Sequence, residues 1–178
     1  MINLFIKVFA HILKLIYGYE ALNILLKNLP SRKINFILRL FGAKIGRNVI
    51  IKSPFIIHNA DEKNEIFSNL KIGDNCFIGR DCIFDLKGKI KIHNNVTISH
   101  RAVFNTHLDI GNSSYFKKKY SSKTGGIIIE EGTYIGSNVT ILHATKIGSN
   151  TIIGASSLVN KNIKDNVIAF GIPCKEKK

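Results

Sequence analysis

The apolar positions of this chain recur every six residues over much of its length. In the C-terminal half, aliphatic residues lead the successive phrases: Ile129, Ile135, Ile141, Ile147, Ile153 and Val159. A small or β-branched residue stands four places after each of the first five. No helical period gives this spacing. A hexapeptide period is the signature of a parallel β-helix, in which each phrase forms a short strand and a turn and stacked coils share one core. We therefore expect an all-β solenoid.

The repeat also extends upstream, with interruptions. It keeps one register over residues 72–90 and continues two residues out of step over 92–110. The slip at Leu86–Ile90 predicts a bulged corner. A weaker trace over 45–57 precedes a polar stretch at 58–69, which we expect to be a turn or a loop.

A second interruption, at 111–127, has no apolar period and carries four lysines and no acidic residue. We expect a loop that projects from the solenoid. Long loops in regular folds are usually functional, because their ordering entropy must be offset by a useful contact. Three consecutive lysines, Lys117 to Lys119, would suit an anionic glycan, and a solvated charge run is the alternative.

Residues 1–42 form a separate arm before the repeat domain at 43–178. Apolar residues from Ile2 to Ile16 recur at helical spacing, and the pattern continues until Pro30. A second helix is expected at 32–41, capped by Ser31 and ended by a glycine. Lysines interrupt the apolar run, so the arm does not reach the roughly 18–20 residues of a membrane span.

Charge adds a candidate role for this arm. The net charge is +14, and residues 1–52 hold nine basic residues against Glu20 alone. An arm of this kind suits peripheral contact with an anionic membrane; helices that cover the end of the solenoid or a subunit contact are the alternative. We expect no nucleic-acid binding, since no recognition motif is present. Three cysteines, of which Cys76 and Cys82 fall on inward positions, indicate free thiols and a cytoplasmic protein.

Several phrases resemble a known family. These are Gly-Thr-Tyr-Ile-Gly-Ser-Asn-Val-Thr-Ile-Leu at 132–142, the run from Lys146 to Lys161, Thr-His-Leu-Asp at 106–109 and Gly-Ile-Pro-Cys-Lys at 171–175. They are similar to the hexapeptide-repeat acyltransferases, and most of all to bacterial sugar and polysaccharide O-acetyltransferases. The resemblance covers residues 43–175. It implies a left-handed parallel β-helix, a homotrimer, and acetyl-CoA bound between neighbouring subunits, with no metal.

The resemblance also implies that His107 is the catalytic base, because it stands just before the projecting loop. An imidazole with a pKa near neutrality can take the proton of a sugar hydroxyl as it attacks a thioester. Its other nitrogen needs an acceptor, for which we name Asp109 or a backbone carbonyl. Asn105 lies two residues earlier on the same strand, where it would bind the acceptor sugar or hydrogen-bond along the coils. Other histidines (His11, His58, His93) are expected in surface or packing roles.

Further site residues follow from the same resemblance. Tyr134 occupies the position of a tryptophan that walls the active site of relatives. Ser137 and Ala155 mark the edge that would bind pantetheine. Lys161 and Lys175 would lie near the phosphates of CoA, as mobile point charges suited to that task.

His143 is a departure from the family pattern, because relatives usually carry Pro-Gly where this chain has His143-Ala144. We name His143 as a second candidate at the site, facing the acceptor or solvent. A γ-type carbonic anhydrase shares this fold and needs three histidines around one metal. His107 and His143 are 36 residues apart, yet they occupy different slots of their phrases and no third histidine follows.

Together these features predict an acetyl-CoA-dependent O-acetyltransferase that acts on a sugar hydroxyl of a cell-surface polysaccharide or its precursor. An N-acetyltransferase on an amino-sugar nucleotide and a non-catalytic β-helix scaffold are the alternatives.

Overall fold

The computed structural model describes residues 2–59 and 66–177, and it begins with a helical layer. Its elements are α1 (Ile2–Tyr17), η1 (Tyr19–Leu22), α2 (Asn23–Asn28) and α3 (Ser31–Leu40). The first apolar run is thus not one helix, because Gly18 adopts φ 75° and ends α1. Pro30, not Ser31, is the N-cap of α3. The Ser31 hydroxyl instead accepts the backbone N–H of Ile51 at 2.9 Å and ties α3 to the solenoid.

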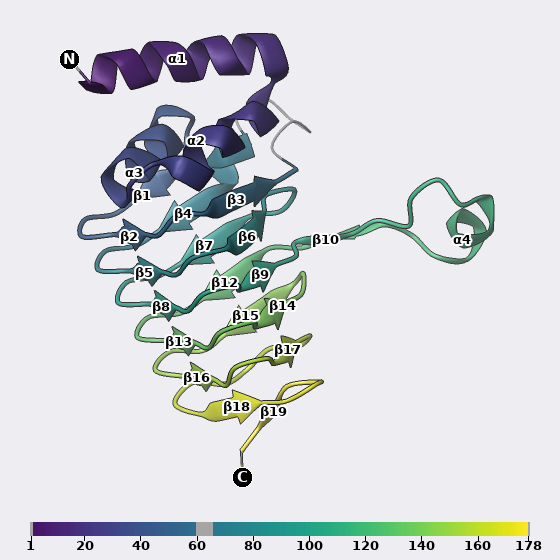
Figure 1. Ribbon diagram of the computed structural model, residues 1–178. Coiled ribbons are helices and arrows are strands. Elements are labelled where there is room, and N and C mark those ends of the chain that lie inside the picture. Colours follow the sequence, from purple (N-terminus) through teal and green to yellow (C-terminus); the bar gives the residue numbers. More distant parts are fainter. Residues whose placement is uncertain (1, 60–65, 178) are drawn as a thin grey trace.

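The described repeat domain stacks its parallel strands into three sheets that share one interior (Figure 1). Sheet A contains β1 (Lys44–Ile45), β4 (Leu70–Ile72), β7 (Ile90–Ile92), β12 (Ile127–Ile129) and β15 (Thr145–Ile147). Sheet B contains β2 (Ile50–Ile51), β5 (Phe77–Ile78), β8 (Thr97–Ile98), β13 (Tyr134–Ile135), β16 (Ile152–Ile153), β18 (Ile168–Phe170) and the antiparallel β19 (Lys175–Glu176). Sheet C contains β3 (Phe55–His58), β6 (Cys82–Asp85), β9 (Val103–Phe104), β14 (Thr140–Ile141) and β17 (Leu158–Val159).

The interior is filled by the aliphatic residue that leads each phrase and by aromatic rings near the N-terminal end. Phe55, Phe84 and Phe104 are fully buried, and the ring of Phe84 lies 5.0 Å from that of Phe55 and 4.3 Å from that of Phe104. Cys76 and Cys82 are buried free thiols, in agreement with their predicted inward positions. This continuous core holds the corners between sheets at fixed positions.

The corners between sheets A and B explain the recurring asparagines. Five of them adopt φ values between 52° and 59°: Asn48, Asn75, Asn95, Asn150 and Asn166. Asparagine tolerates this left-handed conformation better than most residues. Side-chain amides also hydrogen-bond from coil to coil, as Asn48 does to Asn75 at 3.1 Å. The repeated asparagine therefore shapes the corner and links neighbouring coils.

The register slip predicted at 86–90 is present. Ile72 pairs with Ile92, 20 residues on, whereas Ile129 pairs with Ile147 after 18 residues. The extra residues lie in the corner between β6 and β7. The polar stretch at 58–69 begins with His58, the last residue of β3. It ends with the short helix η2 (Ile66–Asn69), and residues 60–65 lie outside the described residues.

A second, projecting arm leaves the solenoid after β9 and is distinct from the N-terminal arm at 1–42. It contains β10 (His107–Leu108), α4 (Ser114–Lys119) and β11 (Lys123–Thr124), and β10 pairs antiparallel with β11. Figure 1 shows this arm projecting sideways from the coils, with α4 at its tip. No residue of α4 is buried, so the tip has no core of its own within one chain.

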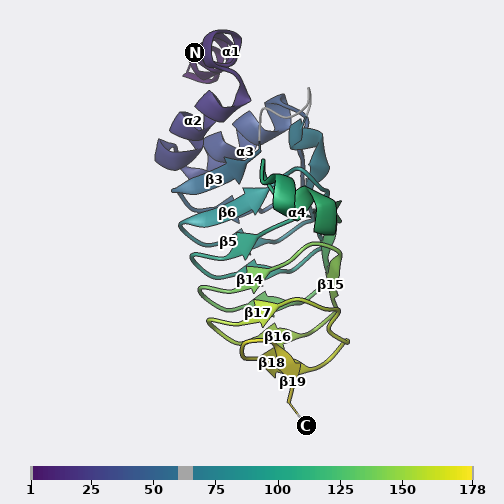
Figure 2. The same ribbon diagram turned by 90° about the vertical axis from the view of Figure 1, so that its right-hand side faces the viewer.

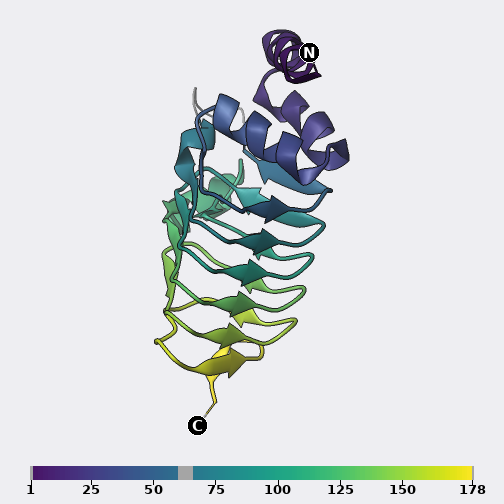
Figure 3. The ribbon, with the colours of Figure 1, turned by 90° about the vertical axis from the view of Figure 1, so that its left-hand side faces the viewer.

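Helix α1 lies across the N-terminal end of the solenoid, above α2 and α3 (Figures 2 and 3). Within residues 2–59 and 66–177, no helix has the length and apolar character needed to cross a membrane.

Candidate active site

A buried carboxylate meets a histidine at the root of the arm. Asp85 ends β6 in sheet C, and His107 begins β10 one coil further along. Nδ1 of His107 lies 2.6 Å from Oδ2 of Asp85. Asp85 is 1% exposed, and the His107 side chain keeps 17% of its surface exposed. The imidazole therefore stands at the boundary between the core and solvent.

Asp85 accepts hydrogen bonds from all sides. Oδ2 accepts the backbone N–H and the hydroxyl of Thr106, each at 2.8 Å, as well as His107. Oδ1 accepts the side-chain amide of Asn59 at 2.7 Å and the backbone N–H of Lys87 at 3.1 Å. Burial acts to raise the pKa of Asp85, but the bonds from Asn59, His107, Lys87 and Thr106 together outweigh it and lower this pKa to about 2. Asp85 is therefore ionised at neutral pH.

The longer corner between β6 and β7 creates this arrangement. Lys87 turns its backbone N–H back to Asp85, and the N–H of Gly88 donates to the Thr106 hydroxyl at 2.7 Å. A Cβ at Gly88 would meet the side chain of Thr106 at 2.9 Å, so the close approach requires glycine. Thr106 in turn fixes the backbone just before His107. The extra residues that cause the register slip therefore also position Asp85 and Thr106 at the candidate site.

This geometry suits proton transfer. A carboxylate at Nδ1 accepts the Nδ1 proton, which leaves the lone pair on Nε2. The same carboxylate stabilises the imidazolium that forms when Nε2 takes a proton. The ring of His58 lies nearby, with its centroid 6.4 Å from that of His107 in a stacked orientation. The pair can therefore act as an oriented general base.

Asp109 and Asn105 take different places from Asp85. Oδ1 of Asp109 accepts the backbone N–H of Gly111 at 2.9 Å and the Ser122 hydroxyl at 3.3 Å. These contacts brace the start of the arm. Asn105 directly follows β9, and its backbone N–H donates to the carbonyl of Ile141 at 2.9 Å. The sequence suggested Asp109 or a backbone carbonyl as the partner of the imidazole, whereas the structure places Asp85 at Nδ1.

The remaining candidates lie on other edges of the solenoid. Tyr134 is exposed on sheet B, and its hydroxyl lies 3.0 Å from that of Ser99. Ser137 follows on the corner between sheets B and C, where its carbonyl accepts the N–H of Ser156, next to Ala155. The two pantetheine candidates therefore stack in adjacent coils.

Lys161 follows β17, at the next corner between sheets C and A. Burial raises the pKa of Cys174, while a hydrogen bond with Ser157 and the charge of Lys161 act in the opposite direction. This electrostatic effect shows that Lys161 lies near the C-terminal segment that carries Lys175, and both lysines are exposed. His143 lies on a corner between sheets C and A, between β14 and β15.

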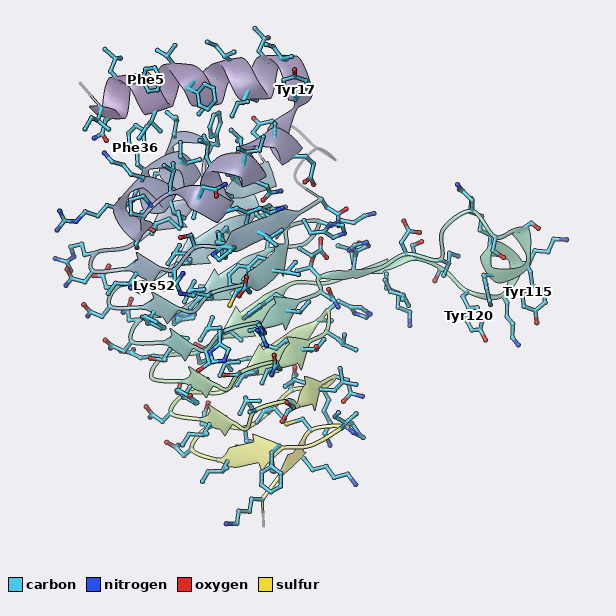
Figure 4. The ribbon with its side chains drawn as sticks, viewed as in Figure 1. Phe5, Tyr17, Phe36, Lys52, Tyr115 and Tyr120 are labelled. Atoms are coloured by element: carbon cyan, nitrogen blue, oxygen red, sulfur yellow. The ribbon has the colours of Figure 1, made fainter. Side chains whose placement is uncertain are left out.

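The projecting arm that contains β10, α4 and β11 carries a hollow of its own. It has a volume of about 600 Å³ and is lined by Leu108, Asp109, Ile110, Phe116, Lys119, Tyr120, Ser121 and Lys123. Aromatic and basic side chains thus begin one residue after His107. Figure 4 shows Tyr115 and Tyr120 at the arm's tip, far from the coils.

Metal chemistry has no evident ligand set in this part of the molecule. Across residues 2–59 and 66–177, no group of three or more His, Cys, Asp or Glu side chains is placed to hold a metal ion.

Comparison with known proteins identifies the family. Residues 126–161 match the bacterial transferase hexapeptide (six repeats), and residues 69–99 match the hexapeptide repeat of succinyl-transferase. A putative colanic acid biosynthesis acetyltransferase of Escherichia coli is 31% identical over 138 residues, which cover 78% of this chain and 70% of that protein. The chain belongs to the hexapeptide-repeat acyltransferases.

Two further relatives support this assignment to the hexapeptide-repeat acyltransferases. A galactoside O-acetyltransferase of Lactococcus lactis is 27% identical over 154 residues, covering 84% of this chain and 68% of that protein. The crystal structure of a hexapeptide-repeat acetyltransferase from Vibrio cholerae superimposes with a TM-score of 0.76 at 19% identity, covering 100% of this chain and 92% of the other. The Vibrio cholerae protein has also been solved in complex with acetyl-CoA. The predicted left-handed parallel β-helix and the acyltransferase class are thereby confirmed.

Proposed function

We propose that this protein is an acetyl-CoA-dependent O-acetyltransferase that acts on a sugar hydroxyl of a cell-surface polysaccharide or its precursor. The observation that carries the proposal is the 2.6 Å contact between Nδ1 of His107 and the buried carboxylate of Asp85. Transfer to a hydroxyl needs a base, and this pair is built as one. The galactoside and colanic acid relatives supply the class of acceptor.

In the proposed reaction, Nε2 of His107 takes the proton of the acceptor hydroxyl as its oxygen attacks the thioester carbonyl of acetyl-CoA. Asp85 stabilises the resulting imidazolium. The tetrahedral intermediate then collapses, the carbon–sulfur bond breaks, and the imidazolium returns its proton to the departing CoA sulfur. Thr106 and Asn59 keep Asp85 ionised and in place throughout.

Binding of acetyl-CoA is assigned to other edges of the solenoid. Ser137 and Ala155 would line the pantetheine, and Lys161 and Lys175 would meet the phosphates. The acetyl-CoA complex of the Vibrio cholerae relative supports acetyl-CoA as the co-substrate. Because acetyl-CoA is an intracellular metabolite and the described cysteines are free thiols, we place the enzyme in the cytoplasm.

The proposed enzyme is a homotrimer, and the separation of its candidate site residues supports a site shared between subunits. Ser137 and Ala155 occupy the corner between sheets B and C, whereas His107 leaves the corner between sheets C and A. Each sheet C strand with the extended residues that flank it runs for about five residues, which separates the two corners by roughly 17 Å. A site that uses both corners is therefore completed by a neighbouring subunit, whose B–C corner faces the first subunit's His107.

The acceptor would enter beside the arm. Tyr134 would wall the site, Asn105 would contact the sugar or hydrogen-bond along the coil, and His143 would face the acceptor from the next coil. The hollow on the projecting arm offers aromatic and cationic side chains, which suit a sugar ring and an anionic glycan.

The test measures CoA release from acetyl-CoA in the presence of a panel of glycans, amino sugars and nucleotide sugars. We expect His107→Ala to lower kcat by about 10²- to 10⁴-fold, the usual contribution of a general base, while acetyl-CoA still binds in calorimetry. His93→Ala is the matched control, because His93 pairs with Glu130 on another corner. Equal turnover by His107→Ala and wild type would refute the assignment of the base. Preference for an amine acceptor would replace O-acetylation with N-acetylation.

A further inference from the structure

Helix α1 has two apolar faces, and among the described residues only one of them packs against the rest of the protein. Ile6, Ala10 and Leu13 are buried against the helices below. On the opposite side of the helix, Leu4 is 65% exposed and Leu15 is 86% exposed. A helix packed on a globular body normally turns polar residues to solvent. The outward face of α1 therefore has an apolar surface that residues 2–59 and 66–177 leave uncovered.

The exposed residues form one continuous patch. A hollow on this face is lined by Leu4, Lys7, Val8, His11, Ile12 and Leu15. A second hollow, lined by Ile2, Leu4, Phe5 and Val8, continues it toward the N-terminus. Phe5 is 72% exposed and its ring stacks on that of Phe9 at 6.3 Å. Contiguous apolar patches of this kind mark interaction sites, whereas isolated exposed residues do not.

The position of the patch restricts what can cover it. Helix α1 lies across the end of the solenoid, and its outward face points along the coil axis (Figures 1 and 4). Subunits that pack side by side through their sheets leave this end open. In such an assembly, all copies of α1 would present their apolar faces in the same direction.

Charge selects the partner. Lys7 borders the patch, Lys14 lies on the same flank with its ammonium 4.6 Å from the Tyr19 ring, and Lys33 donates to Asn3 of α1. Residues 1–33 hold five basic residues against Glu20. A second copy docked end to end would bring these cations together. An anionic lipid surface would neutralise them while it buries the apolar residues.

We propose that the outward face of α1 binds an anionic lipid bilayer, with α1 in the plane of the interface and the solenoid axis perpendicular to it. This proposal concerns residues outside the catalytic site and stands independently of the acetyl transfer proposed above. It assigns the basic and apolar N-terminal arm, residues 1–42, a partner of defined chemistry.

The test is flotation of the full-length protein with vesicles of phosphatidylcholine alone or mixed with phosphatidylglycerol. We expect wild type to float with the anionic vesicles and at least tenfold less with the neutral ones. Flotation of the double variant Val8→Glu, Leu15→Glu with the anionic vesicles should fall to background. Its circular dichroism spectrum should match that of wild type, which shows that the variant is folded. The double variant Lys7→Gln, Lys14→Gln should bind about 10- to 30-fold more weakly, since each lysine near an anionic surface contributes roughly fivefold.

Ile172→Glu is the matched control for lipid binding, because Ile172 is 75% exposed at the far end of the solenoid. It should float as wild type does. The proposal would be overturned if wild type failed to float with anionic vesicles, or if the Val8→Glu, Leu15→Glu protein floated equally well. It would also be overturned if sedimentation equilibrium showed a wild-type assembly of twice the mass of that variant, which would identify a second copy as the occupant. Turnover of the Val8→Glu, Leu15→Glu variant on a soluble acceptor separates loss of lipid binding from loss of catalysis.

Discussion

Replacement of Asp85 by asparagine tests the chemistry of the site with the smallest change in shape. The carboxylate accepts five hydrogen bonds, three at Oδ2 and two at Oδ1. An amide has one oxygen and one NH2 group, so in either orientation its NH2 faces donors. The less costly orientation keeps the oxygen toward Thr106 and His107 and turns the NH2 toward Asn59 and the N–H of Lys87.

The cost to stability follows from that orientation. The Asn59 amide can rotate to offer its oxygen, but the backbone N–H of Lys87 cannot, and it loses its acceptor. One buried unpaired donor costs about 1–3 kcal/mol, and the bonds that remain lose the strength of a charged acceptor. We expect Asp85→Asn to lower the free energy of unfolding by about 2–4 kcal/mol, measured by urea denaturation at pH 7.

The cost to activity has a different origin. The amide oxygen can still accept the Nδ1 proton of His107, but a neutral amide does not stabilise the imidazolium that forms during proton transfer. Loss of the carboxylate from a comparable acid–histidine pair lowers kcat by up to about 10⁴. We expect a loss of 10²- to 10⁴-fold in kcat for Asp85→Asn in the CoA-release assay, with the KM for acetyl-CoA within threefold of wild type.

Two companion variants make the result decisive. Asp74→Asn changes a partly exposed carboxylate that pairs with Arg47 on the corner between sheets A and B, and should leave kcat unchanged. Asp109→Asn tests the partner that the sequence suggested. If Asp85→Asn kept kcat within threefold of wild type while Asp109→Asn lost a hundredfold or more, the role given to Asp85 would be refuted.

Two further predictions concern stability. Asp85 has a folded pKa of about 2, below its ordinary value near 4, so it stabilises the fold by about 2–3 kcal/mol above pH 4, and this contribution is lost as pH falls from about 4 to 2. Urea midpoints across that range should fall more steeply in wild type than in Asp85→Asn, and parallel slopes would contradict the low pKa. Phe84→Ala removes a fully buried ring between two others and should cost about 3–5 kcal/mol in urea denaturation; a loss below 1 kcal/mol would show that the aromatic stack is not part of the stabilising core.

The solenoid could be predicted because its signal is local and repeated. Each phrase places an aliphatic residue inward, and each corner needs a residue such as Asn75 that tolerates positive φ. Many weak signals with one period leave little room for another fold. The division of the N-terminal arm was harder, since the break at Gly18 and the cap at Pro30 depend on packing against the solenoid.

The acidic half of the candidate site was missed for a physical reason. Asp85 is 22 residues before His107 and reaches it only because the coils stack. Two signals in the sequence could have found it. Asp85 directly follows the apolar run Cys-Ile-Phe of a core strand, and the two-residue slip begins immediately after it. A charged residue at the end of a core strand, next to a break in the six-residue period, indicates that the regular coil is interrupted there for a functional site. Asn59, at the edge of the stretch 58–69, and Thr106 were missed in the same way.

The stacking of coils turns the solenoid into a molecular ruler. Adjacent strands lie about 4.8 Å apart. His107 directly follows the third coil, which consists of β7, β8 and β9. The coils above it span about 10 Å, and the two helical layers add about 10 Å each. With α1 on the bilayer, the base stands on the order of 30 Å from the lipid headgroups. Sugars attached directly to a lipid would lie between the bilayer and His107, and only the more distant residues of a growing chain would come level with the imidazole. The number of coils between helix and histidine would then decide which sugar along a chain receives the acetyl group.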